Sequence, residues 1–497
     1  MITMPKPDLE QIKQRATIAA GLREHIGDPG RVIDDQISCK AYESDALTAY
    51  RTPPMLVVIP DTTAELSAVL RFCHQHGVKI VARGAGTSLS GGAHPLADGV
   101  LVQLGRLNQI LDIDYDNRTV TVQPGVTNLA ISKAVDGQGF YYAPDPSSQM
   151  ACSIGGNVAE NSGGVHCLKY GLTTNNILGL EVVLITGEII RIGGKHLDSP
   201  GYDLMGIITG SEGLLGIVSE VTVKILKKPQ TARAMLLGFD DEVQAGNCVA
   251  RIIANGIIPA AMEMMDKPAI HAVESYIQAG YPLEVEALLI IELDGADDEV
   301  TAEIEAIRAL AHSCGARHDS LSQNEQEREQ FWAGRKAAFS ACGTLAPDFL
   351  VMDGTIPRAR LPEVLGRIRE LSTQYQLRVV NVFHAGDGNL HPLILYDANS
   401  HDQLERAEAF GADILRLCVE VGGVLSGEHG IGIEKRDLMG TMFSEVELNQ
   451  QQRIKCAFDP SQLLNPGKVF PHLHRCAELG KLHVHHGKMP HPDLPRF

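Results

Sequence analysis

Apolar positions in the first part of the chain change from helical to strand spacing. Thr62 and Glu65 have the spacing of a helix-capping box, and the apolar residues after them fall on one helical stripe that Gly77 is expected to end. Residues 78–82 then predict a short strand. Residues 1–53 predict a helical and irregular segment in which we identify no chemistry.

The middle of the chain is rich in strand-like runs. Five of them are separated by turn residues, at 100–104, 119–122, 181–184, 188–192 and 216–225. After 232 the pattern changes, because strand-like runs such as 287–293 alternate with long polar helices. We expect those helices at 298–313, 322–340 and 402–420, and a β-hairpin over 378–396 with its turn at 385–389.

These changes of pattern predict a division of the chain into four parts. They are an N-terminal helical segment (1–53), a domain carrying glycine-rich loops (54–231), a second domain (232–471) and a histidine-rich tail (472–497). A length of 497 residues agrees with two or three domains, because one core rarely serves so long a chain.

Composition and charge exclude several classes of protein. The net charge of −18 argues against a nucleic-acid partner, since binding to phosphates needs clustered lysine and arginine. The ten cysteines contain no Cys-x-x-Cys spacing, so iron–sulfur and zinc-knuckle motifs are not expected. Residues 1–14 are polar, and no apolar run is long enough to span a bilayer. We therefore expect a cytoplasmic protein with reduced thiols.

The segment 83–92 has the composition of a diphosphate-binding loop. Gly84, Gly86, Gly91 and Gly92 lack a Cβ and so allow the backbone to approach a phosphate closely. Side-chain donors are available from four neighbours: Arg83, Thr87, Ser88 and Ser90. Leu89 occupies the third glycine position of a Rossmann fingerprint, and a strand-like run follows, so a Rossmann fold is not expected. An ordinary glycine-rich turn remains the alternative for this segment taken alone.

Two further glycine-rich segments make coincidence less probable. One runs from Ser153 to Gly164, the other from Thr209 to Gly213, and a stiff, hydroxyl-bearing turn lies at 144–148. Three such segments in one strand-rich unit suit a long ligand that is contacted along its length. The interpretation is an extended dinucleotide bound by a fold other than the Rossmann fold.

Several of these motifs resemble those of vanillyl-alcohol-oxidase-type flavoproteins. The matching stretches are 82–87, 145–148, 154–157, 210–213 and 464–468. Longer matches at 141–148, 151–170, 352–357 and 472–486 resemble the FAD-linked 2-hydroxy-acid dehydrogenases, the glycolate-oxidising branch in particular. The resemblance implies an α+β fold, with an FAD-binding domain of two α+β subdomains and a C-terminal α+β substrate domain built on an antiparallel sheet.

The resemblance also implies the residues that contact FAD. They are Arg83, Gly84, Ala85, Gly86, Thr87, Ser88, Pro146, Ser147, Ser153, Gly156, Asn157, Gly163, Glu212, Gly213, Ile217 and Asn465. Some relatives attach the flavin covalently to a histidine in the diphosphate loop. Residues 83–92 contain no histidine or cysteine, so non-covalent FAD is expected.

A second constellation has the residue types of a divalent-metal site. His384 and His391 flank the turn of the predicted hairpin, where both imidazoles can converge, and Glu428 lies in a glycine-flanked turn. Each histidine taken singly is more often a core or surface residue. Asp387 and Asn389 are interpreted as turn formers, and the tail histidines as a packed or flexible tail rather than as ligands.

The resemblance assigns roles at this second site. It implies that His384, His391 and Glu428 bind a divalent metal, with zinc, manganese and iron left open, that His429 lies beside the substrate as the base, and that Arg335 binds the substrate carboxylate. Relatives acting on dicarboxylates carry a basic residue before the Asp-Gly-Thr-Ile-Pro motif. Here the apolar run 349–352 precedes Asp353, which favours a small monocarboxylate.

The expected function is oxidation of a small 2-hydroxy acid, glycolate above all, by hydride transfer to the flavin. The resemblance implies a second FAD-binding subunit and an iron–sulfur subunit as partners, and through them a peripheral position at the inner membrane. Two alternatives stay open: a D-lactate or D-2-hydroxyglutarate dehydrogenase that acts alone, and a non-catalytic FAD-binding companion subunit.

Overall fold

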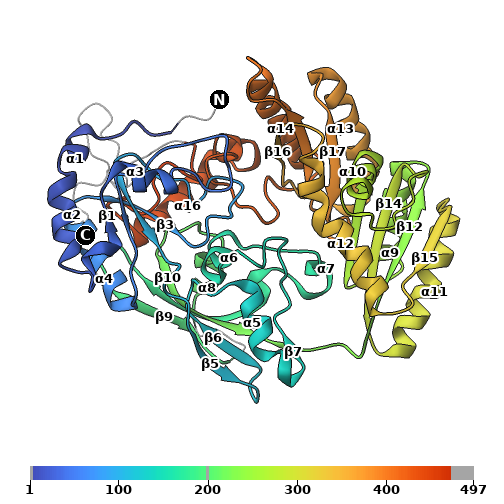
Figure 1. Cartoon of the computed structure of the whole chain (residues 1–497), viewed down its shortest axis with the longest axis horizontal. Helices are drawn as coiled ribbons and strands as arrows, with labels where there is room; N and C mark the ends of the chain where they lie inside the picture. Colours follow the sequence, from blue (N-terminus) through green and yellow to red (C-terminus); the bar gives the residue numbers. More distant parts are fainter. Residues whose placement is uncertain (1–3, 197–200, 472–497) are drawn as a thin grey trace, which may run out of the picture.

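The computed structural model describes residues 4–196 and 201–471 and contains three main sheets (Figure 1). The predicted histidine-rich tail at 472–497 lies outside the described residues. The class is α+β, as expected. None of the helices in the described ranges is long and apolar enough to cross a membrane.

The first sheet has four strands in the order β1-β2-β4-β3. These are β1 (Val32–Ile33), β2 (Leu56–Val58), β4 (Gly99–Gln103) and β3 (Lys79–Arg83), with β2 and β3 both parallel to β4. The helices of this part are α1 (Leu9–Lys13), α2 (Arg15–Arg23), α3 (Gln36–Cys39) and α4 (Thr63–Gln75). Because β1 and α2 contribute to the same apolar core as β2 and α4, residues 1–53 pack as part of this unit.

Helix α4 begins as expected at the N-cap Thr62, whose hydroxyl accepts from the N–H of Glu65. The carboxylate of Glu65 does not complete a capping box. It binds the guanidinium of Arg31 and the N–H groups of Asp61 and Gly27. The ion pair with Arg31, 34 residues earlier in the chain, thus replaces the local bond that the sequence predicted.

The second sheet has five antiparallel strands in the order β5-β6-β10-β8-β9. They are β5 (Ile110–Asp114), β6 (Thr119–Val122), β10 (Ile217–Lys224), β8 (Ile177–Val183) and β9 (Ile189–Gly193). The remaining elements are α5 (Asn128–Val135), α6 (Ile154–Glu160), α7 (Cys167–Tyr170), α8 (Leu204–Ile208), and the pair β7 (Phe140–Tyr141) and β11 (Leu226–Lys227). The second glycine-rich segment therefore opens a helix, because the hydroxyl of Ser153 caps α6.

The third sheet has seven strands, all antiparallel, in the order β15-β12-β14-β13-β17-β18-β16. They are β15 (His318–Leu321), β12 (Thr231–Phe239), β14 (Ala287–Gly295), β13 (Ala261–Asp266), β17 (Val379–Phe383), β18 (Pro392–Tyr396) and β16 (Asp348–Val351). The predicted antiparallel sheet and the hairpin over 378–396 are both present.

Helices cover both faces of this sheet. One face packs against α9 (Glu242–Ala254), α11 (Asp297–Ser313), α13 (Leu361–Tyr375) and α14 (Gln403–Glu420), and the other against α10 (Lys267–Ile277) and α12 (Glu325–Cys342). Alternate residues of β12 enter the two cores, as the pleat of a strand requires. The helices expected at 298–313, 322–340 and 402–420 are α11, α12 and α14.

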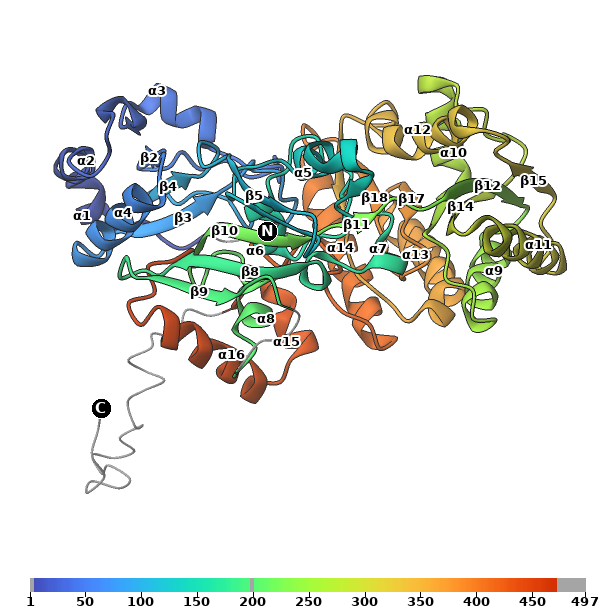
Figure 2. The same ribbon diagram turned by 90° about the horizontal axis from the view of Figure 1, so that it is seen from below.

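The chain after 439 returns to the first sheet. It forms α15 (Met439–Met442) and α16 (Glu445–Phe458), and Leu464 then pairs with Ile80 of β3. Figures 1 and 2 show α16 beside the blue and green elements, whereas α15 contacts α14. The expected domain 232–471 thus contains a last segment that packs on the N-terminal unit, a long-range contact that local patterns do not reveal.

Candidate active site

A cavity of about 570 Å³ lies between the glycine-rich segments and the seven-stranded sheet. The first domain lines it with Gly84, Ala85, Gly86, Thr87, Ser88, Pro146, Ser147, Ser148, Ser153, Gly156, Asn157, Glu160, Glu212, Gly213 and Ile217, among others. The second domain contributes Lys336, Phe339, Ser340, Phe349, Val351, His391, Glu428 and His429. The volume is typical of a small-molecule or cofactor site.

Close backbone approaches shape the glycine-rich wall. A Cβ on Gly84 would lie 2.0 Å from the hydroxyl oxygen of Ser153, and Gly86 has a φ of +74°, which favours glycine. Asn157 lines the same wall, and its buried Nδ2 has no hydrogen-bond partner in the described part of the chain. The close approach of the backbone at Gly84 to Ser153 and the unpaired donor of Asn157 fit an extended ligand rich in hydrogen-bond acceptors, as FAD is.

Three residues predicted to contact the cofactor do not line the cavity. The Arg83 guanidinium turns away to the carbonyls of Ser44 and Ala93. The Asn465 amide donates to the carbonyls of Gly92 and Glu212. These two side chains therefore fix the positions of the loops from behind, a role that a motif comparison does not separate from direct contact.

Gly163 is the third of these residues. Its N–H donates to Oε2 of Glu428 at 3.0 Å, so it lies against the second predicted site. A Cβ there would lie 2.8 Å from the same oxygen. The second glycine-rich segment thus connects the flavin-binding wall with the group that was predicted to bind a metal.

His384, His391 and Glu428 converge as the hairpin predicts. The Nε2 atoms of both histidines lie 3.4 Å from Oε1 of Glu428, and one ligand atom from each residue lies within 4.8 Å of the others. His384 follows β17, and its N–H pairs with the carbonyl of Asn389 across the turn. Two imidazoles and one carboxylate, all largely buried, are a donor set that fits a divalent cation.

Glu263 on β13 lies directly behind this group. Its Oε1 is 2.8 Å from Nδ1 of His384, and its Oε2 accepts from Nε of Arg335 at 2.7 Å. Burial would raise the pKa of Glu263, but His384 and Arg335 outweigh burial and lower it. Burial would likewise lower the pKa of His384, but Glu263 and Glu428 raise it well above its usual value. Glu263 thus directs Nε2 of His384 toward Glu428.

The sequence analysis missed Glu263, although a signal was present. It is a carboxylate flanked on both sides by buried apolar residues of β13. A charge in such a position is rarely buried without a partner.

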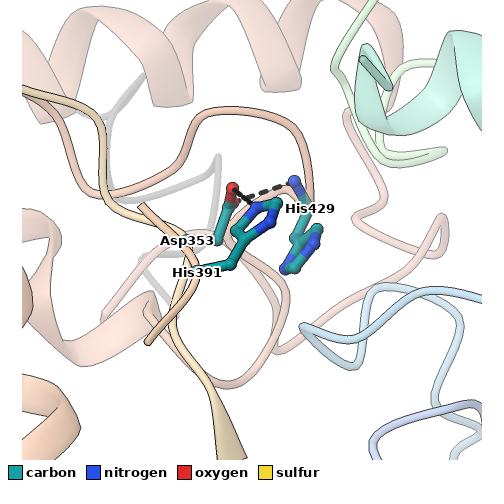
Figure 3. A group of neighbouring side chains, drawn as sticks. All are labelled: Asp353, His391 and His429. Atoms are coloured by element: carbon teal, nitrogen blue, oxygen red, sulfur yellow. Dashed lines mark hydrogen bonds and ion pairs between the residues drawn. The ribbon is translucent and has the colours of Figure 1, made fainter. Parts of the chain in front are cut away.

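Asp353 forms a second cluster with His391 and His429, drawn in Figure 3. Its Oδ1 lies 3.4 Å from Nε2 of His391, and its Oδ2 accepts from the N–H of His429 at 2.9 Å. The same carboxylate accepts from Ser426 at 2.5 Å and from the Lys435 ammonium at 3.0 Å. With its oxygens so occupied, Asp353 fixes the shape of the turn that carries Glu428 and His429 rather than offering itself to a cation.

His429 lines the cavity beside this group. Its ring stacks on His391 with centroids 4.8 Å apart, and its Nδ1 has no hydrogen-bond partner in the described part of the chain. Burial lowers the pKa of His429 to about 4, which keeps the imidazole neutral near pH 7. A neutral imidazole with an unpaired nitrogen can accept a proton.

Arg335 was expected to bind the substrate carboxylate, but it does not line the cavity. It is buried, its Nε is bound to Glu263, and its Nη2 has no hydrogen-bond partner among the described residues. The alternative of a solvated helix face is therefore wrong. The cationic side chain on the cavity wall is its neighbour Lys336, which the sequence analysis did not select.

Comparison with known sequences agrees with this arrangement. Residues 54–193 match the family described as "FAD binding domain", and residues 228–469 match "FAD linked oxidases, C-terminal domain". The chain is 55% identical to "Glycolate oxidase subunit GlcD" of Escherichia coli (strain K12), over 99% of this chain and 97% of that protein. A protein of the same name from Bacillus subtilis (strain 168) is 40% identical over 90% and 95%. A D-lactate dehydrogenase of Archaeoglobus fulgidus is 33% identical over 86% and 96%.

Solved structures resemble the fold. p-Cresol methylhydroxylase gives a TM-score of 0.79 at 16% identity, over 94% of this chain and 98% of that one. The 4-ethylphenol oxidase from Gulosibacter chungangensis gives 0.77 at 19%, over 94% and 99%. The expected two-domain flavoprotein fold, distinct from a Rossmann fold, is confirmed. The chain belongs to the family of FAD-linked oxidases.

Proposed function

We propose that this protein oxidises a small 2-hydroxy monocarboxylate, glycolate above all, to the 2-oxo acid. One observation carries the proposal: His391, Glu428 and His429 share a cavity with the glycine-rich wall that suits FAD. High identity to proteins named glycolate oxidase subunits supports the choice of substrate.

The residues of the cavity would position a divalent cation and FAD, and one of them, His429, would accept a proton. His384, His391 and Glu428 would hold a divalent cation, and the loops at 84–88, 146–148 and 153–157 would hold FAD. When bound, the cation supplies polarisation of the substrate hydroxyl and FAD accepts the hydride equivalent. Nδ1 of His429 accepts the hydroxyl proton, because that atom is unpaired and its ring is neutral.

The substrate carboxylate needs a cationic partner. Lys336 lies on the cavity wall. Arg335, the residue before it on α12, has a buried donor, Nη2, without a hydrogen-bond partner in the described part of the chain. We propose that Lys336 supplies this charge, and that Arg335, which does not line the cavity, supports the site through its bond to Glu263. Phe349 and Val351 line the wall with apolar surface, so a second carboxylate would find no cation there.

The reduced flavin must pass its electrons on. We propose that partner subunits receive them, one binding FAD and one carrying iron–sulfur clusters, and that these attach the protein to the inner membrane. The relatives named glycolate oxidase subunits support a multi-subunit assembly. The D-lactate dehydrogenases among the relatives keep open a second candidate, D-lactate oxidation by this chain alone.

The test is anaerobic reduction of the purified flavoprotein. Glycolate should bleach the visible flavin bands, and initial rates across glycolate, D-lactate and D-2-hydroxyglutarate should rank glycolate first. Preferential bleaching by D-lactate would favour the second candidate. A flavin that no hydroxy acid reduces would make the chain a non-catalytic companion subunit and overturn the proposal.

A further inference from the structure

Two carboxylates meet where the glycine-rich wall contacts the turn that carries His429. Glu160 ends α6, and Glu212 belongs to the third glycine-rich segment. A Cβ on Gly92 would lie 2.3 Å from Oε1 of Glu160 and 3.2 Å from Oε2 of Glu212. A Cβ on Gly430 would lie 2.0 Å from Oε2 of Glu160 and 3.0 Å from Oε1 of Glu212. Both carboxyl groups are therefore packed between these two glycines, and both line the cavity.

The two carboxyl groups differ in their partners. Glu212 accepts from the N–H of Ile431 at 2.7 Å and from that of Gly432 at 2.8 Å, one bond to each oxygen. Glu160 makes no such bonds, and its buried Oε2 has no hydrogen-bond partner among the described residues. Burial raises the pKa of Glu212 as well, but these two N–H groups lower it, so Glu212 is the member of the pair that is better stabilised as a carboxylate.

No cation neutralises the pair directly. The Lys435 ammonium is bound to Asp353 and to the carbonyl of Gly430, and the Lys468 ammonium to the carbonyls of Gly92 and His94. Neither glutamate forms an ion pair within residues 4–196 and 201–471. The charges of Lys435 and Lys468 act on the pair only from a distance, and Asp45 adds a further negative charge. Burial and the charge of Glu212 raise the pKa of Glu160 well above its usual value.

A chain of hydroxyls connects Glu160 to the catalytic turn. The Ser88 hydroxyl lies beside Glu160, whose pKa it lowers slightly against the larger effect of burial, and it is 3.2 Å from the hydroxyl of Ser90, which donates to the carbonyl of His429 at 2.8 Å. Ser88, Ser90 and Gly92 belong to the first glycine-rich loop. The loop therefore contacts the turn through two neighbouring links, the serine pair and the glutamate pair.

We propose that Glu160 is a positioning residue that keeps its proton in the working protein, beside the carboxylate of Glu212. As a neutral acid it holds the first glycine-rich loop against the 428–432 turn. It also keeps a second negative charge out of the cavity wall. The consequence for substrate binding rests on the proposed oxidation of an anionic hydroxy acid.

Ionisation of Glu160 would place two like charges side by side without a cation between them. Repulsion would separate the loop from the turn, and the added charge would oppose an anionic substrate. A group whose pKa is raised in the folded state contributes stability below its unfolded pKa and loses it as pH rises through the folded pKa. The wild-type protein should therefore lose thermal stability and affinity for glycolate on the alkaline side.

The experiment compares the wild-type holoprotein with Glu160→Gln, Glu160→Ala and Glu212→Gln from about pH 6 to about pH 10. Glu160→Gln resembles the protonated acid, so it should keep the neutral-pH Tm and lose less Tm than wild type at alkaline pH. Its KM for glycolate should stay flat where that of wild type rises, by about tenfold per pH unit for a single proton. Glu160→Ala should lower Tm at neutral pH, and its Tm should likewise lack the alkaline loss.

Glu212→Gln tests which residue carries the proton. An amide offers one acceptor oxygen in place of two, so one of the N–H groups of residues 431–432 loses its partner and Tm should fall at every pH. Glu284→Gln, at an exposed position before β14, is the control and should follow wild type. An alkaline loss of Tm in Glu160→Gln equal to that of wild type would overturn the proposal, as would a neutral-pH loss equal to that of Glu212→Gln. The Tm comparison decides this even if glycolate proves not to be the substrate.

Discussion

At the scale of single residues, Gly86 is a position on the cavity wall whose backbone conformation favours glycine. Its φ is +74° and it lines the cavity, so Gly86→Val adds both strain and a side chain at the wall. The purified variant should contain no flavin, judged from its visible absorbance. Gly77→Val is the matched control, because Gly77 has a φ of +64° with open space around it. That variant should lose stability and keep FAD, whereas a yellow Gly86→Val would contradict the assignment.

His384 and Glu428 are predicted to bind a metal and not the flavin. His384→Ala or Glu428→Ala should abolish bound divalent metal and turnover while the flavin content stays normal, because the glycine-rich wall is unchanged. Elemental analysis of the purified proteins is the measurement. Asp387→Asn is the control, since the Asp387 carboxylate accepts the N–H of Asn389 and belongs to neither ligand group. Wild type without a divalent metal would contradict the prediction.

His429 is predicted to be a base and not a ligand. Its main-chain N–H, rather than its ring, is bound to Asp353, and its Nε2 lies 4.0 Å from Glu428. His429→Asn should keep both metal and FAD and lose at least about 10²-fold in turnover. A substrate analogue should still bind. Loss of the metal from this variant would instead make His429 a ligand, and unchanged turnover would make it structural.

At the scale of elements, the site depends on the register of β13 and β17. Their pairing sets Met264 opposite Phe383, which brings Glu263 beside His384. Glu263→Gln keeps the shape but removes the charge that orients His384 and binds Arg335. Metal affinity should fall about 10–100-fold with normal flavin content, measured by metal titration of the chelated protein. Glu303→Gln on α11 is the control, and equal affinity in Glu263→Gln and wild type would show that His384 is oriented by other contacts.

At the scale of the whole molecule, a buried polar network joins the two domains. His166 of the first domain contacts Asp145 at 2.8 Å and Glu292 of β14 at 3.3 Å. Glu292 also binds Arg328 at 2.8 Å and accepts from the indole of Trp332, both on α12. Since α12 carries Lys336 and Phe339 into the cavity, this network sets the distance between the flavin wall and the substrate wall.

Glu292→Gln should weaken this contact by about 1–3 kcal/mol, because the partly exposed His166 and Arg328 each lose one of two acidic partners and keep Asp145 and Glu325. Burial would raise the pKa of Glu292, but His166 and Arg328 outweigh it and lower the pKa to about 2. A lowered carboxyl pKa contributes stability above the unfolded pKa of about 4.5 and loses it as pH falls toward about 2. The Tm difference from wild type should thus be largest around neutral pH. It should shrink below about pH 5, as Glu292 is protonated, and at alkaline pH, as His166 loses the proton that Asp145 and Glu292 stabilise despite burial. A difference that does not vary with pH would show that packing, not charge, joins the domains.

Sequence patterns were sufficient for much of the molecule. Glycine-rich segments, alternating strands and the hairpin histidines are local features, and each appears where it was predicted. Eight cysteines of the described residues are free, which agrees with the expectation of reduced thiols. Local spacing determines element type because backbone and side-chain periodicity act over a few residues.

Tertiary structure decided which of those residues face the cavity. Arg83 and Asn465 sit in matching motifs but turn to neighbouring carbonyls, while Glu263, Asp353 and Glu160 acquire their roles from partners more than 50 residues away. A buried charge takes its function from whichever group lies within about 3 Å, and folding brings distant segments to that distance. The sequence therefore determined the helices, the strands and the candidate motifs. Tertiary packing determined which residues of those motifs contact the ligand, which support the loops and which can carry a proton.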